Sequence, residues 1–285
     1  MDATTPPGTL WALKELHPHV RRNPTELALL RVEAYRTALF SHPHLVSPRA
    51  FDPAGGALGL AYVDGVSLAY LLDAGRRAGG SLDPAVVVRV LLDVLSALEA
   101  VHAERDDGTR LVHGDVNPRN VLVDRSGHAW LGDFGAAAPA NMVTPFRGTL
   151  AYAAPEVLRN AAGGPASDLF SVAVMGWEAL RGERLFRRRT ASETMVAVVE
   201  QPAPPVDQRR PALRALREGF EEALRPDLAH RPATAATWAQ HLAAAIAPAA
   251  RGIVGELVAH RAAAEFTRRD QALADVRQHL GCSSR

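Results

Sequence analysis

One short stretch of the chain, residues 113–135, reads HGDVNPRNVLVDRSGHAWLGDFG and constrains the fold more than any other. Two apolar runs, VLV at 121–123 and AWL at 129–131, flank the turn sequence DRSG. Apolar runs of this length around a polar, glycine-containing turn predict a β-hairpin. Because a hairpin returns its two ends to each other, we expect Asn120 and Asp133, which lie at those ends, to come together.

Three polar residues of this stretch have side chains suited to one kind of chemistry. Asn120 and Asp133 offer amide and carboxylate oxygens, which Mg²⁺ prefers together with phosphate oxygens. Asp115 offers a carboxylate that can accept or orient the proton of a hydroxyl group. A lone Asp or Asn in a loop is usually a turn former, so only the joint spacing of all three is informative.

These spacings resemble the catalytic loop and the DFG segment of protein kinases. The resemblance implies that Asp115 acts on the acceptor hydroxyl and that Asn120 and Asp133 hold Mg²⁺, with ATP as the phosphoryl donor. Phosphoryl transfer requires mainly positioned charge and aligned oxygens, which these residue types supply.

Lys14 is the only lysine among the 32 lysine and arginine residues of the chain. A bias toward arginine should spare a lysine only where a compact ammonium differs functionally from a planar guanidinium. The run ALKEL around it resembles the kinase strand whose lysine holds the α- and β-phosphates and pairs with a glutamate of helix αC. Apolar residues on one face predict a helix at about residues 25–40. On this helix Glu33 is the expected partner of Lys14, with Glu26 as the alternative.

Downstream segments extend the resemblance to the bacterial, eukaryotic-type Ser/Thr protein kinases. The run RGTLAYAAPE at 147–156 is similar to the end of their activation segment. It implies that Thr149 lines the site of the substrate hydroxyl and that Glu156 pairs with Arg231. Asp168 is similar to the helix αF aspartate that anchors the catalytic loop.

The resemblance implies an α+β fold of two lobes, a protein-kinase-like fold with a truncated β-rich N-lobe and a mainly helical C-lobe. We expect the N-lobe at residues 1–64, a hinge near 61–65, the C-lobe at 65–247 and a helical extension at 248–285. Apolar residues recur at helical spacing in that extension. Docking of the extension on the C-lobe is expected, and contact with a partner is the alternative.

The resemblance also places the nucleotide pocket. Residues 56–68, GALGLAYVDGVSL, read as a strand followed by a glycine-containing linker. Five residues are implied around the adenine: Leu60 as gatekeeper, Ala61 and Val63 in the hinge, Ala12 above the ring and Leu122 below it. Plain core packing is the other interpretation of these apolar residues.

The sequence departs from the family pattern at three points. The glycine-rich loop that covers the phosphates of ATP is expected farther before Lys14 than the sequence extends, so either the sequence starts late or the chain is a relative without this loop. Asn117 replaces a lysine that is usual in Ser/Thr kinases, and Arg119 resembles the placement that tyrosine kinases use instead. Gly114 replaces an arginine that reads activation-loop phosphate in many kinases.

We therefore expect ATP-dependent phosphorylation of Ser or Thr in a protein substrate. A pseudokinase, which binds or scaffolds without efficient turnover, is the alternative. Small-molecule phosphotransferases of the aminoglycoside and choline type share the HGD, Asn and Asp pattern but lack the APE segment at 154–156 and its arginine partner.

Charge and composition argue against nucleic-acid-binding, membrane-bound and disulfide-rich classes of protein. A formal net charge of +1 argues against nucleic acid as the main partner, because such domains usually carry a marked basic excess. No run of about 18 uncharged apolar residues occurs, and MDATTPPGTL lacks the regions of a signal peptide. We expect no membrane contact and a cytoplasmic location. One cysteine, Cys282, excludes an internal disulfide framework.

Two further segments of the chain are a long apolar run and a short basic run. The longest apolar run, at 84–102, is broken by Arg89, Asp93 and Glu99, and reads as a buried helix with Asp83 as N-cap. The basic run RLFRRRT at 184–190 is either a solvated charge run or a selector of acidic substrates.

Overall fold

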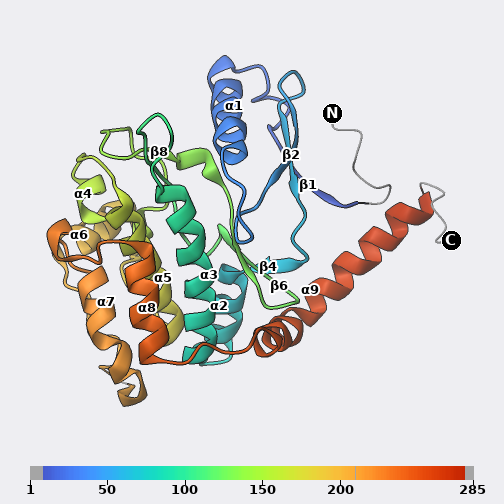
Figure 1. Cartoon of the computed structure of the whole chain (residues 1–285). Coiled ribbons are helices and arrows are strands. Elements are labelled where there is room, and N and C mark those ends of the chain that lie inside the picture. The colour runs from blue at the N-terminus through green and yellow to red at the C-terminus, as the bar shows by residue number, and fades with distance from the viewer. Residues whose placement is uncertain (1–8, 209, 280–285) are drawn as a thin grey trace.

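The structure is a computed structural model that describes residues 9–208 and 210–279. Cys282 and the outermost ends of the predicted N-lobe and of the C-terminal extension lie outside the described residues. Figure 1 shows a small lobe of strands and one helix beside a larger lobe made mainly of helices. The predicted α+β fold class is confirmed.

The small lobe is an antiparallel sheet with a helix packed against it. Its elements in chain order are β1 (Trp11–Glu15), α1 (Pro24–Ala38), β2 (Pro48–Asp52) and β3 (Ala57–Ala61). The strand order is β1-β3-β2. Asn23 caps α1 by accepting the amide of Thr25, and Pro24 occupies the first turn. The structure thus begins the predicted helix at Pro24 and ends it at Ala38.

The large lobe follows directly on β3. Its first half comprises β4 (Gly65–Ser67), α2 (Leu68–Arg77), α3 (Pro84–His102), β5 (Leu111–Val112), β6 (Val121–Asp124), β7 (Ala129–Leu131), η1 (Phe134–Ala136), β8 (Ala138–Pro139) and η2 (Leu150–Tyr152). Its second half comprises α4 (Pro155–Leu158), α5 (Pro165–Arg181), α6 (Ala191–Glu200), η3 (Pro211–Leu216), α7 (Arg217–Ala223), η4 (Leu228–His230), α8 (Ala235–Ala245) and α9 (Arg251–His279). Helices α3 and α5 form the centre of the core, where Leu95, Leu98, Val172 and Met175 are fully buried.

The predicted hairpin is present as β6 and β7. The two strands pair antiparallel, with Leu122 opposite Trp130. The Asp124 side chain accepts hydrogen bonds from the amides of Ser126 and His128 and from the Trp130 indole. These contacts fix the turn. The linker predicted after β3 contains an additional strand, β4, which pairs with β6.

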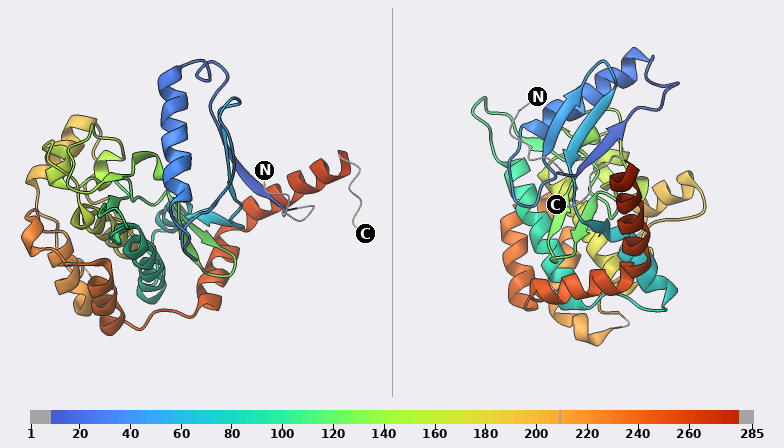
Figure 2. Two further views of the ribbon diagram at one scale, coloured as in Figure 1. Left: turned by 45° about the horizontal axis from the view of Figure 1, so that its top comes forward. Right: turned by 90° about the vertical axis from the view of Figure 1, so that its right-hand side faces the viewer.

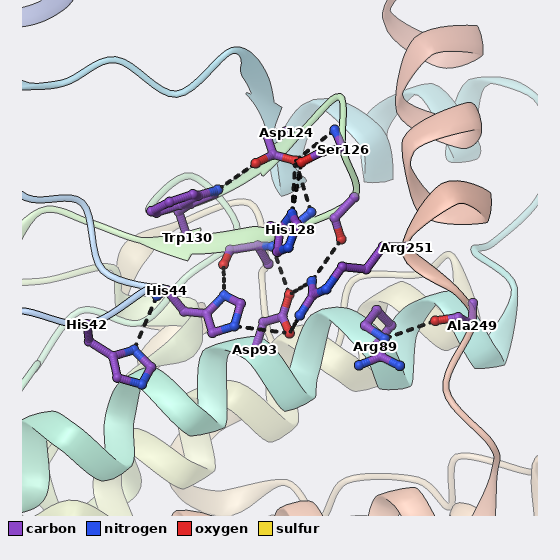
Figure 3. A network of polar contacts seen from close by, with 12 residues as sticks. His42, His44, Arg89, Asp93, Asp124, Ser126, His128, Trp130, Ala249 and Arg251 are labelled. Atoms are coloured by element: carbon purple, nitrogen blue, oxygen red, sulfur yellow. Dashed lines mark hydrogen bonds and ion pairs between the residues drawn. The ribbon is translucent and has the colours of Figure 1, made fainter.

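One buried carboxylate fastens the hairpin to the helices beneath it. Asp93 of α3, which is 3% exposed, accepts the amide of Ala129 at 3.0 Å. Both terminal nitrogens of Arg251 donate to the same carboxylate, at 2.7 and 3.0 Å, and the His44 ring lies 3.5 Å from it. Figure 3 shows Arg251, from the start of α9, and His44, from the segment before β2, converging on Asp93.

Helix α9 packs on the large lobe, in agreement with the expected docking of the C-terminal extension. Its residues Val254, Val258, Ala262 and Phe266 recur every four positions and are buried. This stripe faces the region of α2, β4 and β6. Glycine is needed at position 255, because a Cβ there would collide with the carbonyl oxygen of Arg125.

The second half of α9 reaches the hinge and then leaves the body of the molecule. Arg269 donates to the Asp64 carboxylate at 2.7 Å and to the Gly65 carbonyl at 2.9 Å. Arg125 at the hairpin turn binds Asp270 at 3.2 Å. Beyond these contacts the helix projects away from both lobes (Figures 1 and 2). No helix within the described part of the chain is both long and apolar enough to cross a membrane.

Candidate active site

Lys14 lies between the two lobes and contacts two carboxylates. Its ammonium nitrogen is 2.6 Å from Glu33 Oε1 and 3.1 Å from Asp133 Oδ1. Strand β1 supplies the lysine, α1 supplies the glutamate, and Asp133 follows the hairpin of the large lobe. Of the two glutamates considered on the helix, Glu33 is therefore the partner in this structure.

Burial and charge act in opposite directions on these three groups. Burial lowers the pKa of Lys14, but the hydrogen bond to Glu33 and the charge of Asp133 outweigh it, so the pKa lies above its ordinary value. For Glu33, burial and, to a smaller extent, Asp133 raise the pKa more than Lys14 lowers it. For Asp133, burial is outweighed by the Lys14 ammonium, and the pKa lies below its ordinary value. Lys14 and Asp133 are thus held in their charged forms.

Asp133 has a strained backbone that its neighbours hold in place. Its φ of 66° lies in the left-handed region, which non-glycine residues seldom adopt. The next residue, Phe134, is 1% exposed and its ring packs on Phe40 and His113 with centroids 5.3 and 5.0 Å away. The buried ring fixes the chain direction, and the Asp133 carboxylate faces Lys14 as a result.

Asp115, Asn120 and Thr149 form one hydrogen-bonded group. The Thr149 amide donates to Asp115 Oδ1 at 2.8 Å. The Asn120 side-chain amide donates to the Asp115 carbonyl at 2.9 Å and to Asp115 Oδ2 at 3.1 Å. Since the amide nitrogen of Asn120 is turned toward Asp115, its oxygen is turned the other way. The activation segment thereby brings Thr149 to the predicted catalytic carboxylate.

Asp168 at the start of α5 anchors this loop from below. It is 1% exposed and accepts the amides of His113 and Gly114 at 2.7 and 2.9 Å. His102 of α3 contacts the same carboxylate at 2.8 Å. Burial opposes ionisation, yet these donors outweigh it and place the pKa of Asp168 below its ordinary value.

Gly114 has a backbone conformation that explains its identity. Its φ is +76°, and a Cβ at this position would lie 2.7 Å from the carbonyl oxygen of Ala136. Glycine adopts such a conformation at no steric cost. The residue before Asp115 is therefore set by the close approach of the DFG segment to the loop.

A second buried ion pair holds the end of the activation segment. Arg231 donates to both carboxylate oxygens of Glu156 at 2.9 Å, and the Ser167 hydroxyl adds a further hydrogen bond at 2.7 Å. The paired, planar geometry is the strong form of this interaction. The pairing of Glu156 with Arg231, which the sequence implied, is present.

The residues expected around adenine lie on neighbouring elements. Ala12 of β1 is directly opposite Leu60 of β3 in the sheet register. Ala61 ends β3, and Val63 lies between β3 and β4. Leu122 lies in the middle of β6, on the strand that pairs with β4. Contact of these residues with a nucleotide stays a prediction.

The residues present fit a magnesium ion that is shared with a phosphate ligand. Asp133 provides a charged carboxylate, and the Asn120 oxygen is turned away from Asp115. Mg²⁺ is usually held by one or two protein oxygens together with substrate phosphates. Within residues 9–208 and 210–279 no cluster of three or more His, Cys, Asp or Glu could hold a metal by itself. The His-Pro-His sequences at 17–19 and 42–44, which lie within these described residues, are not part of such a cluster either.

Sequence reasoning missed two residues that support the site. Asp93 was noted only as an interruption of an apolar run, and His102 was not singled out. A charged residue at an apolar position of a buried helix is itself a sign of a buried network, and this sign could have revealed Asp93. His102 is the last residue of α3, and the surrounding sequence gives no comparable sign of a buried contact.

A lysine–glutamate pair facing an Asp–Asn–Asp set across two lobes defines the class of protein-kinase-like phosphotransferases. Comparison with known proteins agrees, because the model of the protein kinase domain family matches residues 3–244. The chain belongs to the protein kinase family.

Three of the curated relatives are bacterial proteins. The serine/threonine-protein kinase PknA of Mycobacterium tuberculosis is 31% identical over 215 residues, which cover 70% of this chain and 47% of the relative. The probable serine/threonine-protein kinase pknA2 of Bifidobacterium longum is 31% identical over 186 residues, covering 62% and 23%. The serine/threonine-protein kinases drp72 of Corynebacterium efficiens is 31% identical over 232 residues, covering 77% and 42%. The matched region thus spans less than half the length of these relatives.

Proposed function

We propose that this chain transfers the γ-phosphoryl group of ATP to Ser or Thr side chains of a protein substrate. The observation that supports this best is the double contact of Lys14 with Glu33 and Asp133. That contact joins the two lobes around the place where a nucleotide would lie. Because ATP is a cytoplasmic substrate, we place the reaction in the cytoplasm.

Each residue has a distinct part in this proposal. Lys14, oriented by Glu33, neutralises charge on the α- and β-phosphates. Asp115 orients the acceptor hydroxyl and accepts its proton. Asn120 and Asp133 hold Mg²⁺, which when bound neutralises charge on the phosphate oxygens.

The remaining residues place the two reactants. Ala12, Leu60, Ala61, Val63 and Leu122 surround the adenine ring. Thr149 lies against Asp115 and lines the place of the acceptor hydroxyl. Ser or Thr as acceptor is supported by the names of the relatives and by the GTLAY sequence near the end of the activation segment.

The direct test compares Asp115→Asn with the wild type. Removal of a positioned general base lowers the rate by about 10²–10⁴-fold. The measurement is transfer of radioactive phosphate from ATP to Ser- and Thr-containing protein, with a matched Asp107→Asn control in an exposed turn. Equal rates for Asp115→Asn and the wild type would remove the enzymatic function.

A thermal-shift measurement separates the kinase from a pseudokinase. A raised melting temperature with Mg²⁺ and ATP, without any transfer, would indicate a nucleotide-binding scaffold. Asp133→Asn should abolish the part of the shift that requires Mg²⁺, because it removes a charged oxygen ligand. A Mg²⁺-dependent shift that survives Asp133→Asn unchanged would contradict the metal assignment. Faster transfer to choline or an aminoglycoside than to protein would contradict the substrate class.

A further inference from the structure

A cavity of about 500 Å³ opens beside the proposed acceptor site. Thr149 and Gly148 of the activation segment line one end, next to Asn117 and Arg119 of the catalytic loop. The other end is lined by α2 and by residues 184–191, which connect α5 to α6. We call this cavity the arginine groove.

The groove is strongly basic although the chain as a whole is nearly neutral. Five of its lining residues are arginines: Arg119, Arg184, Arg187, Arg188 and Arg189. The lining of the groove contains one carboxylate, that of Asp73. A concave surface lined by one sign of charge focuses its potential and attracts ligands of the opposite sign.

The acidic residues near the groove are already engaged. Asp73 binds Arg76 and Arg184. Glu178, which is fully buried, accepts hydrogen bonds from Arg184 at 3.0 Å and from the Tyr152 hydroxyl at 2.9 Å. The positive charge of Arg184 is thereby neutralised by Asp73 and Glu178.

The other arginines keep their charge. Arg188 donates to the Leu185 carbonyl and to the Gln201 side chain, which are both neutral. Among the described residues Arg119, Arg187 and Arg189 have exposed side chains and no ion pair. Four guanidinium groups therefore face the groove region without a carboxylate partner.

The backbone around these arginines is fixed. Leu185 and Phe186 are buried at one end of the run 187–189. At its other end Thr190 caps α6, where its hydroxyl accepts the Glu193 amide and its own amide donates to the Glu193 carboxylate. A solvated charge run needs no such anchoring, whereas a binding surface gains from it because less entropy is lost on binding.

We propose that the arginine groove selects protein substrates in which anionic side chains flank the Ser or Thr that is phosphorylated. Guanidinium groups bind carboxylates and phosphates through paired hydrogen bonds, so the anion is either Asp and Glu or a residue that already carries phosphate. The inference rests on the proposed function, since Asp115 and Thr149 define where the acceptor lies.

The test uses peptides that share one acceptor Ser and differ only in its flanking residues, which are Glu, Gln, Lys or phosphoserine. The wild type should phosphorylate the Glu peptide with a kcat/KM at least about tenfold above that of the Gln peptide, and the Lys peptide least. Raising the salt concentration should reduce this preference because exposed charges are screened. Preference for phosphoserine over Glu identifies phosphate as the anion, and the reverse identifies carboxylate.

Substitution of groove arginines tests the contribution of the groove without changing the catalytic residues. The double variant Arg187→Gln, Arg189→Gln should lose most of the preference for the Glu peptide while phosphorylating the Gln peptide as the wild type does. The control Arg22→Gln, Arg214→Gln removes the same charge from exposed arginines outside the groove and should keep the preference.

Peptide binding, measured by fluorescence anisotropy, separates the inference from the proposed function. Equal phosphorylation of the Glu, Gln and Lys peptides would overturn the inference and leave the kinase function intact. Binding of the Glu peptide that is lost in the groove variant, without any phosphorylation, would support the groove and contradict the kinase function. Competition by a single-stranded oligonucleotide as strong as by the Glu peptide would overturn selection of peptides.

Discussion

At the scale of single residues, the structure places charged side chains of the site against oppositely charged partners. Lys14 has Glu33 and Asp133, and Glu156 has Arg231. A buried carboxylate costs free energy unless charge or hydrogen bonds offset the loss of water. Charged residues in this core are therefore informative about function or positioning wherever they occur.

Asp168 gives a prediction that depends on pH. Its folded pKa lies below the ordinary value of 3.8, so the ionised form stabilises the fold above about pH 4, and this stabilisation is lost as the pH falls through the folded pKa. Asp168→Asn should lower the free energy of unfolding by about 2–4 kcal/mol at neutral pH.

The measurement is urea unfolding of both proteins between about pH 7 and pH 3. The difference between wild type and Asp168→Asn should stay constant down to about pH 4 and then shrink. The control is Asp106→Asn, because Asp106 lies exposed in a turn. A difference that stays constant down to about pH 3 would contradict the claim that the charged form of Asp168 holds the loop.

At the scale of elements, the C-terminal helix is tied to the hairpin that carries the predicted metal ligands. Arg251 begins α9 and shares the Asp93 carboxylate with Ala129 of β7. Farther along, Arg269 reaches Asp64 and Gly65 behind the hinge. The helix therefore braces both ends of the segment that leads from the hinge to the hairpin.

Removal of Arg251 tests this bracing. Arg251→Ala leaves the buried Asp93 without its charged partner, which should cost about 2–4 kcal/mol of stability. Amide hydrogen exchange should accelerate in β7 and in the first turns of α9. The control is Arg268→Ala, since Arg268 is exposed and pairs with Glu265 of its own helix. Equal exchange in both variants would show that α9 docks without the Asp93 contact.

At the scale of the whole molecule, Lys14 is the contact that joins the two lobes at the site. An arginine would keep the positive charge, but its planar fork does not fit a position that must meet two carboxylates and phosphates as a compact ammonium. Lys14→Arg should weaken ATP binding by about tenfold or more, with little effect on stability, because the lysine side chain is partly exposed.

Isothermal titration with Mg²⁺ and ATP measures this effect. Arg21→Lys, a change between the same residue types at a partly exposed position of the small lobe, is the matched control. Wild-type affinity in Lys14→Arg would show that the lone lysine reflects no requirement of the nucleotide site.

Local sequence patterns were sufficient to predict several helices and strands. The hairpin at 121–131, the helix that begins at Pro84 and the helix that carries Glu33 all follow from apolar periodicity, turn residues and caps. These are short-range effects, so they can be read from neighbouring residues alone. The spacing of Asp115, Asn120 and Asp133 likewise indicated the family before any contact was known.

Contacts between distant segments required the tertiary structure. Only the fold shows that Glu33 rather than Glu26 meets Lys14, that Asp93 joins α9 to the hairpin, and that the arginines at 187–189 line a groove beside Thr149. Such contacts depend on how far apart elements pack, which no local pattern encodes. The sequence by itself determined the family and the residue types of the site. The tertiary structure decided their partners and charges, because burial and ion pairing arise only when the lobes and helices come together.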